Sequence, residues 1–272
     1  MNYVPELAEV ETVRLVLKKQ ILNKKIKEIK ILYPNIIESD INDFKSALKG
    51  SSFIDIQRKG KYLIFETPHQ YLISHLRMEG KYFIKKHSEE ISKHEHIIFV
   101  FEDFDLRYHD TRKFGRMVLI NKDSLTQYFK NLGPDANGKV DSNYLYSKIH
   151  NKKVPIKTLL LDQSIISGLG NIYVDEVLHA SKINPFEYGT NITINDTKNI
   201  LENSKRILDM AIKYKGTTIR SYTSSLNVQG EYQNYLKVHT KEGDTCFCKS
   251  VIVKDKVGGR STYFCPNCQR LK

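Results

Sequence analysis

The first 245 residues of this 272-residue chain contain no cysteine. All four cysteines lie in the last 27 residues, as Cys246, Cys248, Cys265 and Cys268. Their absence elsewhere excludes a disulfide network across the chain, and their clustering predicts a small module held by a metal ion. A pair of disulfides within the module is the alternative, and the reducing conditions around a cytoplasmic protein weigh against it.

Long apolar runs are also missing. No run approaches the roughly 20 residues needed to cross a bilayer. The start of the chain mixes Glu and Lys with apolar positions, which is unlike a signal peptide. These absences exclude a membrane-spanning protein and favour a cytoplasmic location. A hydrophobic content of 40% is ample for one large or two modest packed cores.

Acidic residues are outnumbered by basic ones. The 31 Asp and Glu residues face 43 Lys and Arg residues, and the net charge is +12. Such an excess favours a polyanionic partner such as nucleic acid. Membrane-surface proteins are also basic, and an AT-biased genome enriches Lys, so charge alone does not name the partner.

The first half of the chain has the pattern of strands behind one helix. Residues 6–22 predict a helix, because apolar residues such as Leu7, Val10 and Leu17 recur at helical spacing. Short segments rich in β-branched and aromatic residues then predict strands. These segments are residues 26–32, 53–58, 62–66, 71–75, 96–101 and 117–120. We therefore predict a β-sandwich with a leading helix.

The second half is predicted to be mainly helical. Helical patterns cover residues 141–149, 156–161, 172–182 and 194–215. A polar segment, residues 217–231, follows and is either a lid or a surface loop. We therefore predict an α+β chain with three domains. They are a β-sandwich over residues 1–133, a helical domain over 134–233 and the cysteine module over 234–272.

The cysteine module has the composition of a zinc finger. Its second pair has the normal two-residue spacer, whereas its first pair, Cys246-Phe-Cys248, has only one intervening residue. Four thiolates suit tetrahedral zinc in a segment too short to build its own core, with a metal-free hairpin as the alternative. Residues 234–272 contain eight Lys or Arg against three Asp or Glu, a net charge of +5 that suits phosphate binding.

Two further motifs suit DNA binding. Gly168 and Gly170 lie between an apolar helical segment and a helix that begins at Asn171, and a glycine turn before a helix N-terminus suits a phosphate. Such glycines also serve packing alone. Arg112 and Phe114 lie on a tight loop, where Phe could wedge into a base stack and Arg could bond the unpaired base. The alternative is a hairpin with a snorkelling Arg and a core Phe.

Together, these segments occur in an order that resembles the formamidopyrimidine-DNA glycosylase family. The segments are PELAEVET, SHLRMEGKY, DTRKFG, GLGNIYVDE and, in the cysteine module, GRSTYFCPNCQ. The resemblance extends over nearly the whole chain. It implies an N-terminal β-sandwich catalytic domain, a helix-two-turns-helix DNA-binding domain and a C-terminal β-hairpin zinc finger. The four cysteines would hold one structural Zn²⁺.

The resemblance also implies an activity. Members of this family excise oxidised purines such as 8-oxoguanine and formamidopyrimidines in base excision repair, and then cleave the strand by β,δ-elimination. By analogy, Pro5 is the nucleophile that attacks the sugar C1′ and Glu6 is the proton donor. Lys61 would assist β-elimination and Arg260 δ-elimination. The implied partner is double-stranded DNA that contains oxidised bases or abasic sites, and the implied state is a monomer.

DNA contacts are implied at further positions. They are His75, Met78, His94, Arg112, Phe114, Lys152, Lys157 and Asn171. Of these, Lys157 and Asn171 would bind phosphates around the lesion together with Arg260. Met78 would join Arg112 and Phe114 in filling the gap left by the flipped base. Met78 favours this branch over the endonuclease VIII branch, which acts on oxidised pyrimidines.

Residues Met1–Val4 precede the proline that the resemblance assigns as nucleophile. A proline inside a chain has a tertiary amide nitrogen without a usable lone pair. A terminal proline amine, with a reference pKa of about 8, is roughly one-tenth unprotonated at pH 7. We expect translation to begin at Val4 through a GTG codon, followed by loss of the initiator methionine. A blocked Pro5 would instead leave a protein that binds damaged DNA without reacting.

Overall fold

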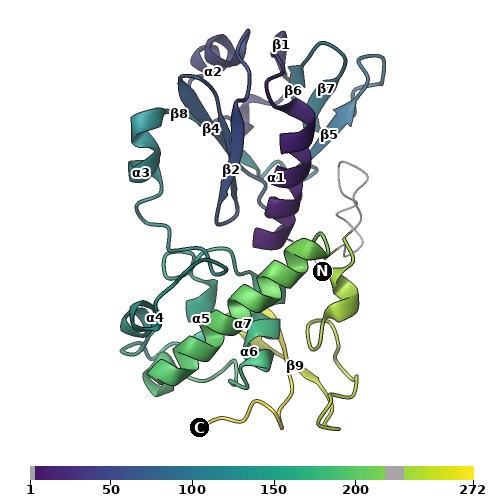
Figure 1. Cartoon of the computed structure of the whole chain (residues 1–272). Coiled ribbons are helices and arrows are strands. Elements are labelled where there is room, and N and C mark those ends of the chain that lie inside the picture. Colours follow the sequence, from purple (N-terminus) through teal and green to yellow (C-terminus); the bar gives the residue numbers. More distant parts are fainter. Residues whose placement is uncertain (1–3, 218–229) are drawn as a thin grey trace. The chain divides into compact units, whose positions relative to one another are not determined.

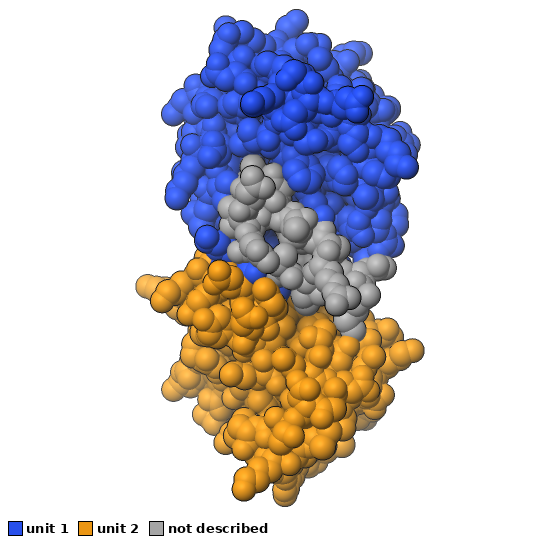
Figure 2. All heavy atoms as spheres, turned by 90° about the vertical axis from the view of Figure 1, so that its right-hand side faces the viewer, with its two compact units in different colours: residues 1–130, 215–230 blue, residues 131–214, 231–272 orange. Residues whose placement is uncertain are grey.

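The structure is a computed structural model that describes residues 4–217 and 230–272. The chain divides into two compact units, shown in different colours in Figure 2. Unit 1 contains residues 1–130 and 215–230, and unit 2 contains residues 131–214 and 231–272. The cysteine module therefore belongs to the same compact unit as the helices that precede it.

Unit 1 begins with helix α1 (Leu7–Ile21), which confirms the helix predicted over residues 6–22 (Figure 1). The apolar residues Leu7, Val10 and Leu17, which predicted the helix, are fully buried. The helix packs against strand β2 (Asp55–Lys59). It is shorter than predicted by one residue at each end, because Glu6 and Leu22 are its capping residues.

Two antiparallel sheets of four strands form the body of unit 1 in the described part of the chain, with strand orders β1-β6-β7-β5 and β2-β3-β4-β8. The remaining strands are β1 (Glu28–Ile31), β3 (Tyr62–Glu66), β4 (Gln70–His75), β5 (Lys81–Lys85), β6 (Glu95–Val100), β7 (Asp105–His109) and β8 (Arg116–Asn121). Aromatic contacts connect the sheets, with ring centroids 5.7 Å apart for Phe65 and Tyr82 and 6.1 Å apart for Phe53 and Phe99. The predicted β-sandwich is confirmed.

Some elements of unit 1 were not predicted. Strand β7 carries Arg107, a fully buried residue whose guanidinium lies 3.0 Å from both Glu95 and Asp105, so its charge interrupts the apolar pattern of a buried strand. Helix α2 (Ile41–Leu48) buries only Phe44 and Leu48, which is too short an apolar stripe to recognise. Strand β5 and the short elements η1 (Pro34–Ile36), η2 (Lys122–Ser124) and α3 (Leu125–Tyr128) were also missed.

Unit 2 contains the predicted helices. They are α4 (Ser142–Ile149), α5 (Ile156–Leu161), α6 (Asn171–Ala180) and α7 (Ile194–Lys213), with the short elements η3 (Gly189–Asn191) and η4 (Tyr232–Tyr235). Helix α7 packs against α4 and α6. It ends before the predicted residue 215, because Lys215 and Gly216 take left-handed φ angles of 61° and 78°.

The cysteine module contains one hairpin, formed by β9 (Val253–Val257) and β10 (Arg260–Phe264). Val257 pairs with Arg260, so Gly258 and Gly259 alone form the turn. Their φ angles of 56° and 76° are those of a tight hairpin turn that favours glycine at both positions. Within the described residues, none of the helices combines the length and the apolarity needed to span a bilayer.

Candidate active site and metal centre

The N-terminus of α1 holds the two residues predicted to perform the first chemical steps. Pro5 is buried immediately before Glu6, the N-cap residue, which is 2% exposed. Glu6 and Glu9 form a capping box, in which the backbone N–H of Glu6 donates to Glu9 Oε2 over 3.0 Å. This arrangement fixes both predicted catalytic residues relative to the helix axis.

Glu9 is a residue of this site that the sequence analysis did not single out. Its Oε1 accepts hydrogen bonds from the backbone N–H of Thr217 (2.9 Å) and from the Thr217 hydroxyl (3.2 Å). The buried carboxylate of Glu9 therefore caps α1 and also binds Thr217, the first residue of the segment predicted to be a lid or a surface loop. Most of that segment lies outside the described residues. The three-residue spacing between Glu6 and Glu9 was the available signal.

Lys61, in a turn, lies near His75, at the end of a neighbouring strand. Lys61 lies in the two-residue turn between β2 and β3, and Tyr62, the next residue, pairs with His75 on β4. His75 Nδ1 accepts a hydrogen bond from the backbone N–H of Arg77 over 2.9 Å. Burial, followed by the charges of Arg77 and Lys61, lowers the pKa of His75 to about 3. The imidazole is therefore neutral near pH 7.

The loop that carries Arg112 and Phe114 is closed by a buried carboxylate. Asp110 accepts hydrogen bonds from the backbone N–H groups of Arg112 (3.0 Å) and Gly115 (2.8 Å). Its own N–H donates to the carbonyl of His94 over 2.9 Å, so His94 supports this loop. A Cβ at Gly115 would lie 1.6 Å from the hydroxyl oxygen of Tyr108, which explains the glycine.

Arg112 and Phe114 form a pair at the surface of unit 1. The Arg112 guanidinium lies 4.7 Å from the Phe114 ring centroid, and Phe114 is 46% exposed. The alternative of a core Phe at this position is therefore wrong. The Thr111 hydroxyl donates to Glu79, so the turn that carries the half-buried Met78 adjoins this loop.

In unit 2, the first residue of α6 is attached to the cysteine module. Asn171 Nδ2 donates to the carbonyl of Ser261 over 2.9 Å, and Asn171 Oδ1 has no hydrogen-bond partner within the described structure. Arg260, which precedes Ser261, is exposed beside the two-glycine turn. Lys152 is exposed in the connection between α4 and α5. These three residues are the predicted DNA contacts that reach the surface of unit 2.

Lys157 bonds to the same Ser261 carbonyl as Asn171, but its side chain is not exposed. Its ammonium is fully buried and lies 2.7 Å from Asp175 Oδ1. It also donates to the carbonyl of Ser261 and to the hydroxyl of Thr262, each over 2.9 Å. The structure thus places Lys157 beneath the N-terminus of α6, where it connects α5, α6 and β10.

Two acidic residues of α6 anchor the cysteine module, and the sequence analysis gave them no role. Glu176 accepts hydrogen bonds from the backbone N–H groups of Lys237, Val238 and His239, each over 2.9 Å. Asp175 accepts a hydrogen bond from His239 Nδ1 over 2.8 Å, in addition to its ion pair with Lys157. Their only signal in the sequence is a pair of acidic residues inside an apolar helix.

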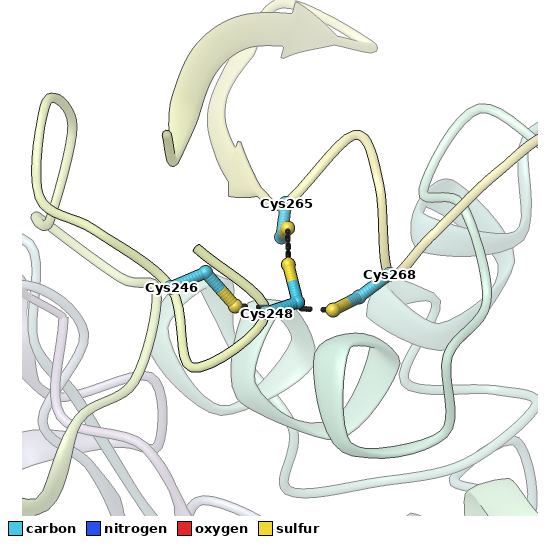
Figure 3. Close-up of side chains that lie close together, drawn as sticks. All are labelled: Cys246, Cys248, Cys265 and Cys268. Atoms are coloured by element: carbon cyan, nitrogen blue, oxygen red, sulfur yellow. Dashed lines mark hydrogen bonds between the residues drawn. The ribbon is translucent and has the colours of Figure 1, made fainter. Parts of the chain in front are cut away.

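The four cysteine side chains converge on one point, as Figure 3 shows. All four sulfur atoms lie within 4.8 Å of one another. The Sγ atoms of Cys246 and Cys268 are 3.8 Å apart, and those of Cys248 and Cys265 are 3.4 Å apart. Tetrahedral Zn²⁺ with Zn–S bonds of about 2.3 Å requires S···S distances of about 3.8 Å, so the cluster fits zinc.

Three of the thiols have shifted pKa values. Burial raises the pKa of Cys246 and of Cys268, whereas hydrogen bonds, first from the Asn267 side chain, lower the pKa of Cys248 to about 6. Only a cation makes four thiolates at this spacing favourable. No disulfide is formed, and all four cysteines are free.

Three family models match the chain in the order of its architecture. The formamidopyrimidine-DNA glycosylase N-terminal domain matches residues 4–117, and the formamidopyrimidine-DNA glycosylase H2TH domain matches residues 132–223. The zinc finger found in FPG and IleRS matches residues 248–271. The match contains Cys248, Cys265 and Cys268, and Cys246 completes the cluster of four sulfur atoms, which fits one structural Zn²⁺.

Full-length relatives agree with these matches. The chain is 43% identical over 272 residues to the formamidopyrimidine-DNA glycosylase of Streptococcus pneumoniae, covering 98% of this chain and 99% of the relative. It is 42% identical over 274 residues to that of Mycoplasma genitalium, covering 98% and 96%.

Solved structures agree as well. A Lactococcus lactis FPG mutant in complex with a Fapy-dG containing DNA superposes with a TM-score of 0.94 at 41% identity, covering 98% of this chain and 100% of that chain. MutM in complex with carbocyclic 8-oxo-G containing DNA gives a TM-score of 0.92 at 40% identity with the same coverage. The chain belongs to the formamidopyrimidine-DNA glycosylase family.

Proposed function

We propose that this protein excises oxidised purines from double-stranded DNA and then cleaves the strand at the abasic site, as a glycosylase and lyase of base excision repair. The observation that carries the proposal is the placement of Pro5 directly before Glu6 at the N-terminus of α1. The solved relatives support the substrate class, since they include complexes with Fapy-dG and 8-oxo-G containing DNA.

Pro5 acts as the nucleophile when it is the terminal residue. Its secondary amine attacks C1′ of the damaged nucleotide, the bond from C1′ to the base breaks, and Glu6 donates a proton. The C1′–O4′ bond then breaks, O4′ takes up a proton, and the ring-opened sugar is joined to the enzyme as a Schiff base. The positive end of the α1 dipole lies beside this amine and favours its unprotonated form near pH 7. Lys61 then assists β-elimination, and Arg260 assists δ-elimination.

The binding residues fall into two groups. In unit 1, Phe114, Arg112 and Met78 fill the gap left by the flipped base, and His75 and His94 contact the DNA around it. Because His75 is neutral, it contributes hydrogen bonding and no charge.

In unit 2, Lys152, Asn171 and Arg260 contact phosphates. We assign Lys157 a positioning role, because its ammonium already bonds to Asp175, Ser261 and Thr262 inside the unit. The zinc is structural, and it stabilises the module whose hairpin carries Arg260.

Borohydride trapping tests the proposed chemistry. Protein that begins at Pro5 and protein that begins at Met1 are incubated with a duplex containing 8-oxoguanine opposite cytosine, with borohydride present. Only a Schiff base is reduced to a stable link, so a crosslinked band is expected with the Pro5 form alone. No band with either form would refute the amine mechanism and support a protein that binds damaged DNA without reacting. Preference for a thymine glycol duplex would instead indicate the pyrimidine-specific branch.

We further propose that the protein acts on the chromosome as a monomer with three functional regions, residues 1–133, 134–233 and 234–272. Among the described residues, the exposed large apolar side chains lie in separate elements, as with Leu32, Ile91 and Val251, and this favours no extensive apolar interface. Light scattering during size-exclusion chromatography should give the mass of one chain, and a mass of two chains would contradict the proposal.

A further inference from the structure

The zinc site has a neighbour that comes from outside the cysteine module. His179 Nε2 lies 3.5 Å from the Sγ of Cys246, within hydrogen-bonding distance of a sulfur acceptor. His179 is in the last turn of α6 and is 7% exposed. Cys246 is the first member of the pair whose spacer is one residue instead of two.

The position of His179 follows from the helix that carries it. Asp175 and Glu176 lie four and three residues before His179, so the three side chains share one face of α6. Asp175 and Glu176 bind the start of the cysteine module, through His239 Nδ1 and the backbone N–H groups of residues 237–239. His179 continues this line of contacts to Cys246.

Phe247, the residue between Cys246 and Cys248, also contacts the imidazole of His179. Phe247 is 78% exposed, and its ring meets the His179 ring edge to face with centroids 5.9 Å apart. A phenylalanine this exposed gains little from burial, and its ring contact with His179 connects the short spacer to α6. The one-residue spacer therefore places a sulfur and a ring against the same histidine.

We propose that His179 donates an N–H···S hydrogen bond from Nε2 to the zinc-bound thiolate of Cys246, and thereby belongs to the zinc site of this chain. Four thiolates around Zn²⁺ leave an excess of negative charge on sulfur, which N–H donors offset. A spacer shortened by one residue has one backbone N–H fewer to direct at the first sulfur. His179 supplies a donor at that position.

His179 acts as a donor and not as a fifth ligand. Four sulfur atoms within 4.8 Å of one another already complete a tetrahedron. The donor role also does not depend on the charge of the ring, because the Nε2–H group is present both in the protonated imidazole and in one neutral tautomer. His179 is therefore a positioning residue for the metal site and takes no part in the reaction with DNA.

The test compares His179→Phe with the unmodified full-length protein. Zinc affinity is measured by competition with a chromogenic chelator, and the sulfur environment is measured by the sulfur-to-metal charge-transfer band of the Co²⁺-substituted protein. Loss of an outer-sphere partner typically weakens metal binding by about 10–100-fold, and we expect a loss near the lower end with a shift of the Co²⁺ band to lower energy. His150→Phe is the matched control, since His150 bonds to the carbonyl of Tyr146 on α4 in the same unit. It should leave both readouts unchanged.

A second pair of variants separates the hydrogen bond from packing. His179→Gln keeps an N–H donor and His179→Leu removes it, while both replace the ring. We expect His179→Gln to retain most of the zinc affinity and the Co²⁺ band, and His179→Leu to behave like His179→Phe. Equal behaviour of the Gln and Leu variants, or unchanged zinc affinity and band position in His179→Phe, would overturn the proposal.

Discussion

The two units differ in whether the side chains of their predicted DNA-binding residues lie at the surface or inside the unit. Unit 1 presents Arg112 and Phe114 at its surface, and the loop is held by backbone hydrogen bonds to Asp110. Unit 2 uses Lys157 internally, where it bonds to Asp175 and to the carbonyl of Ser261. Residues that share a motif thus divide into those that are available to a ligand and those that build the platform.

The energetics of the two arrangements also differ. The Lys157–Asp175 pair is fully desolvated, so each charge depends on the other and on the remaining hydrogen bonds around it. The Arg112–Phe114 pair is partly exposed, and its loss leaves no buried charge behind. Loss of Lys157 should therefore reduce stability, whereas loss of Arg112 or Phe114 should reduce binding alone.

The largest effect, and the clearest separation of catalysis from binding, is expected from a change of Glu6. Glu6→Gln keeps an acceptor at the N-cap of α1 but removes the proton that we assign to base release. Loss of a positioned general acid lowers the rate by about 10²–10⁴-fold, so excision from an 8-oxoguanine duplex should nearly vanish while DNA affinity is preserved. Single-turnover excision and gel-shift binding measure the two effects.

Glu11→Gln is the control for Glu6→Gln, because Glu11 is on the same helix and pairs with Arg14 and Arg58. It should leave the excision rate close to that of the unmodified protein. Normal excision by Glu6→Gln would remove Glu6 from the mechanism.

A comparison of two lysines tests the division within unit 2. Lys157→Met leaves Asp175 buried without its partner, and breaking a buried ion pair in this way destabilises a protein by about 3–5 kcal/mol. Lys152→Met removes an exposed charge, so it should leave the free energy of unfolding unchanged and reduce the salt dependence of DNA binding. Denaturant unfolding and binding at several salt concentrations give these quantities. The comparison fails if the two variants exchange their effects.

The exposed wedge of unit 1 should matter only for binding. Phe114→Ala removes a ring whose stacking on bases is worth about 1–3 kcal/mol, so affinity for a damaged duplex should fall by roughly 10-fold or more. Leu32→Ala is the control, since Leu32 is an apolar side chain in the same unit with a similar exposed fraction, 51% against 46% for Phe114. Fluorescence anisotropy measures both affinities, and equal losses would show that Phe114 has no special role.

The smallest effect is expected from His75. Its folded-state pKa of about 3 lies below the ordinary value of 6.5, so the unfolded chain takes up a proton that the folded protein excludes. The contribution of His75 to stability is therefore fully present above about pH 6.5 and decreases as the pH falls toward 3. His75→Asn keeps an acceptor for the Arg77 N–H, and it should lose about 1–2 kcal/mol less than the unmodified protein between pH 7 and pH 5. Identical losses would contradict the assignment.

Periodic apolar patterns predicted most of the fold. The helix over residues 156–161 has the same bounds in the sequence and in the structure, because its apolar residues face one core. Strand β7 and helix α2 were missed because their signals are tertiary. Arg107 is tolerated in a strand only because Glu95 and Asp105 lie beside it, a pairing that the linear pattern does not contain.

The candidate site was predictable in its residues but not in their surroundings. The sequence contains PELAEVET, but it does not reveal that Glu9 bonds to Thr217, more than 200 residues away in the chain. It contains the short spacer between Cys246 and Cys248, but not the imidazole of His179 beside it. Contacts between distant segments arise from folding, so local spacing leaves them undetermined.

All cysteines of the chain lie in the metal centre, so the reactivity of its thiols reports the loss of zinc. The chain has four thiols, and all four are in one cluster. A zinc-bound thiolate reacts more slowly with thiol reagents than a released one, because its lone pair is shared with the metal. The average number of reactive thiols per chain therefore reports the fraction of molecules without zinc. It rises from none in the zinc-loaded protein to four in the zinc-free protein, and no engineered label is needed.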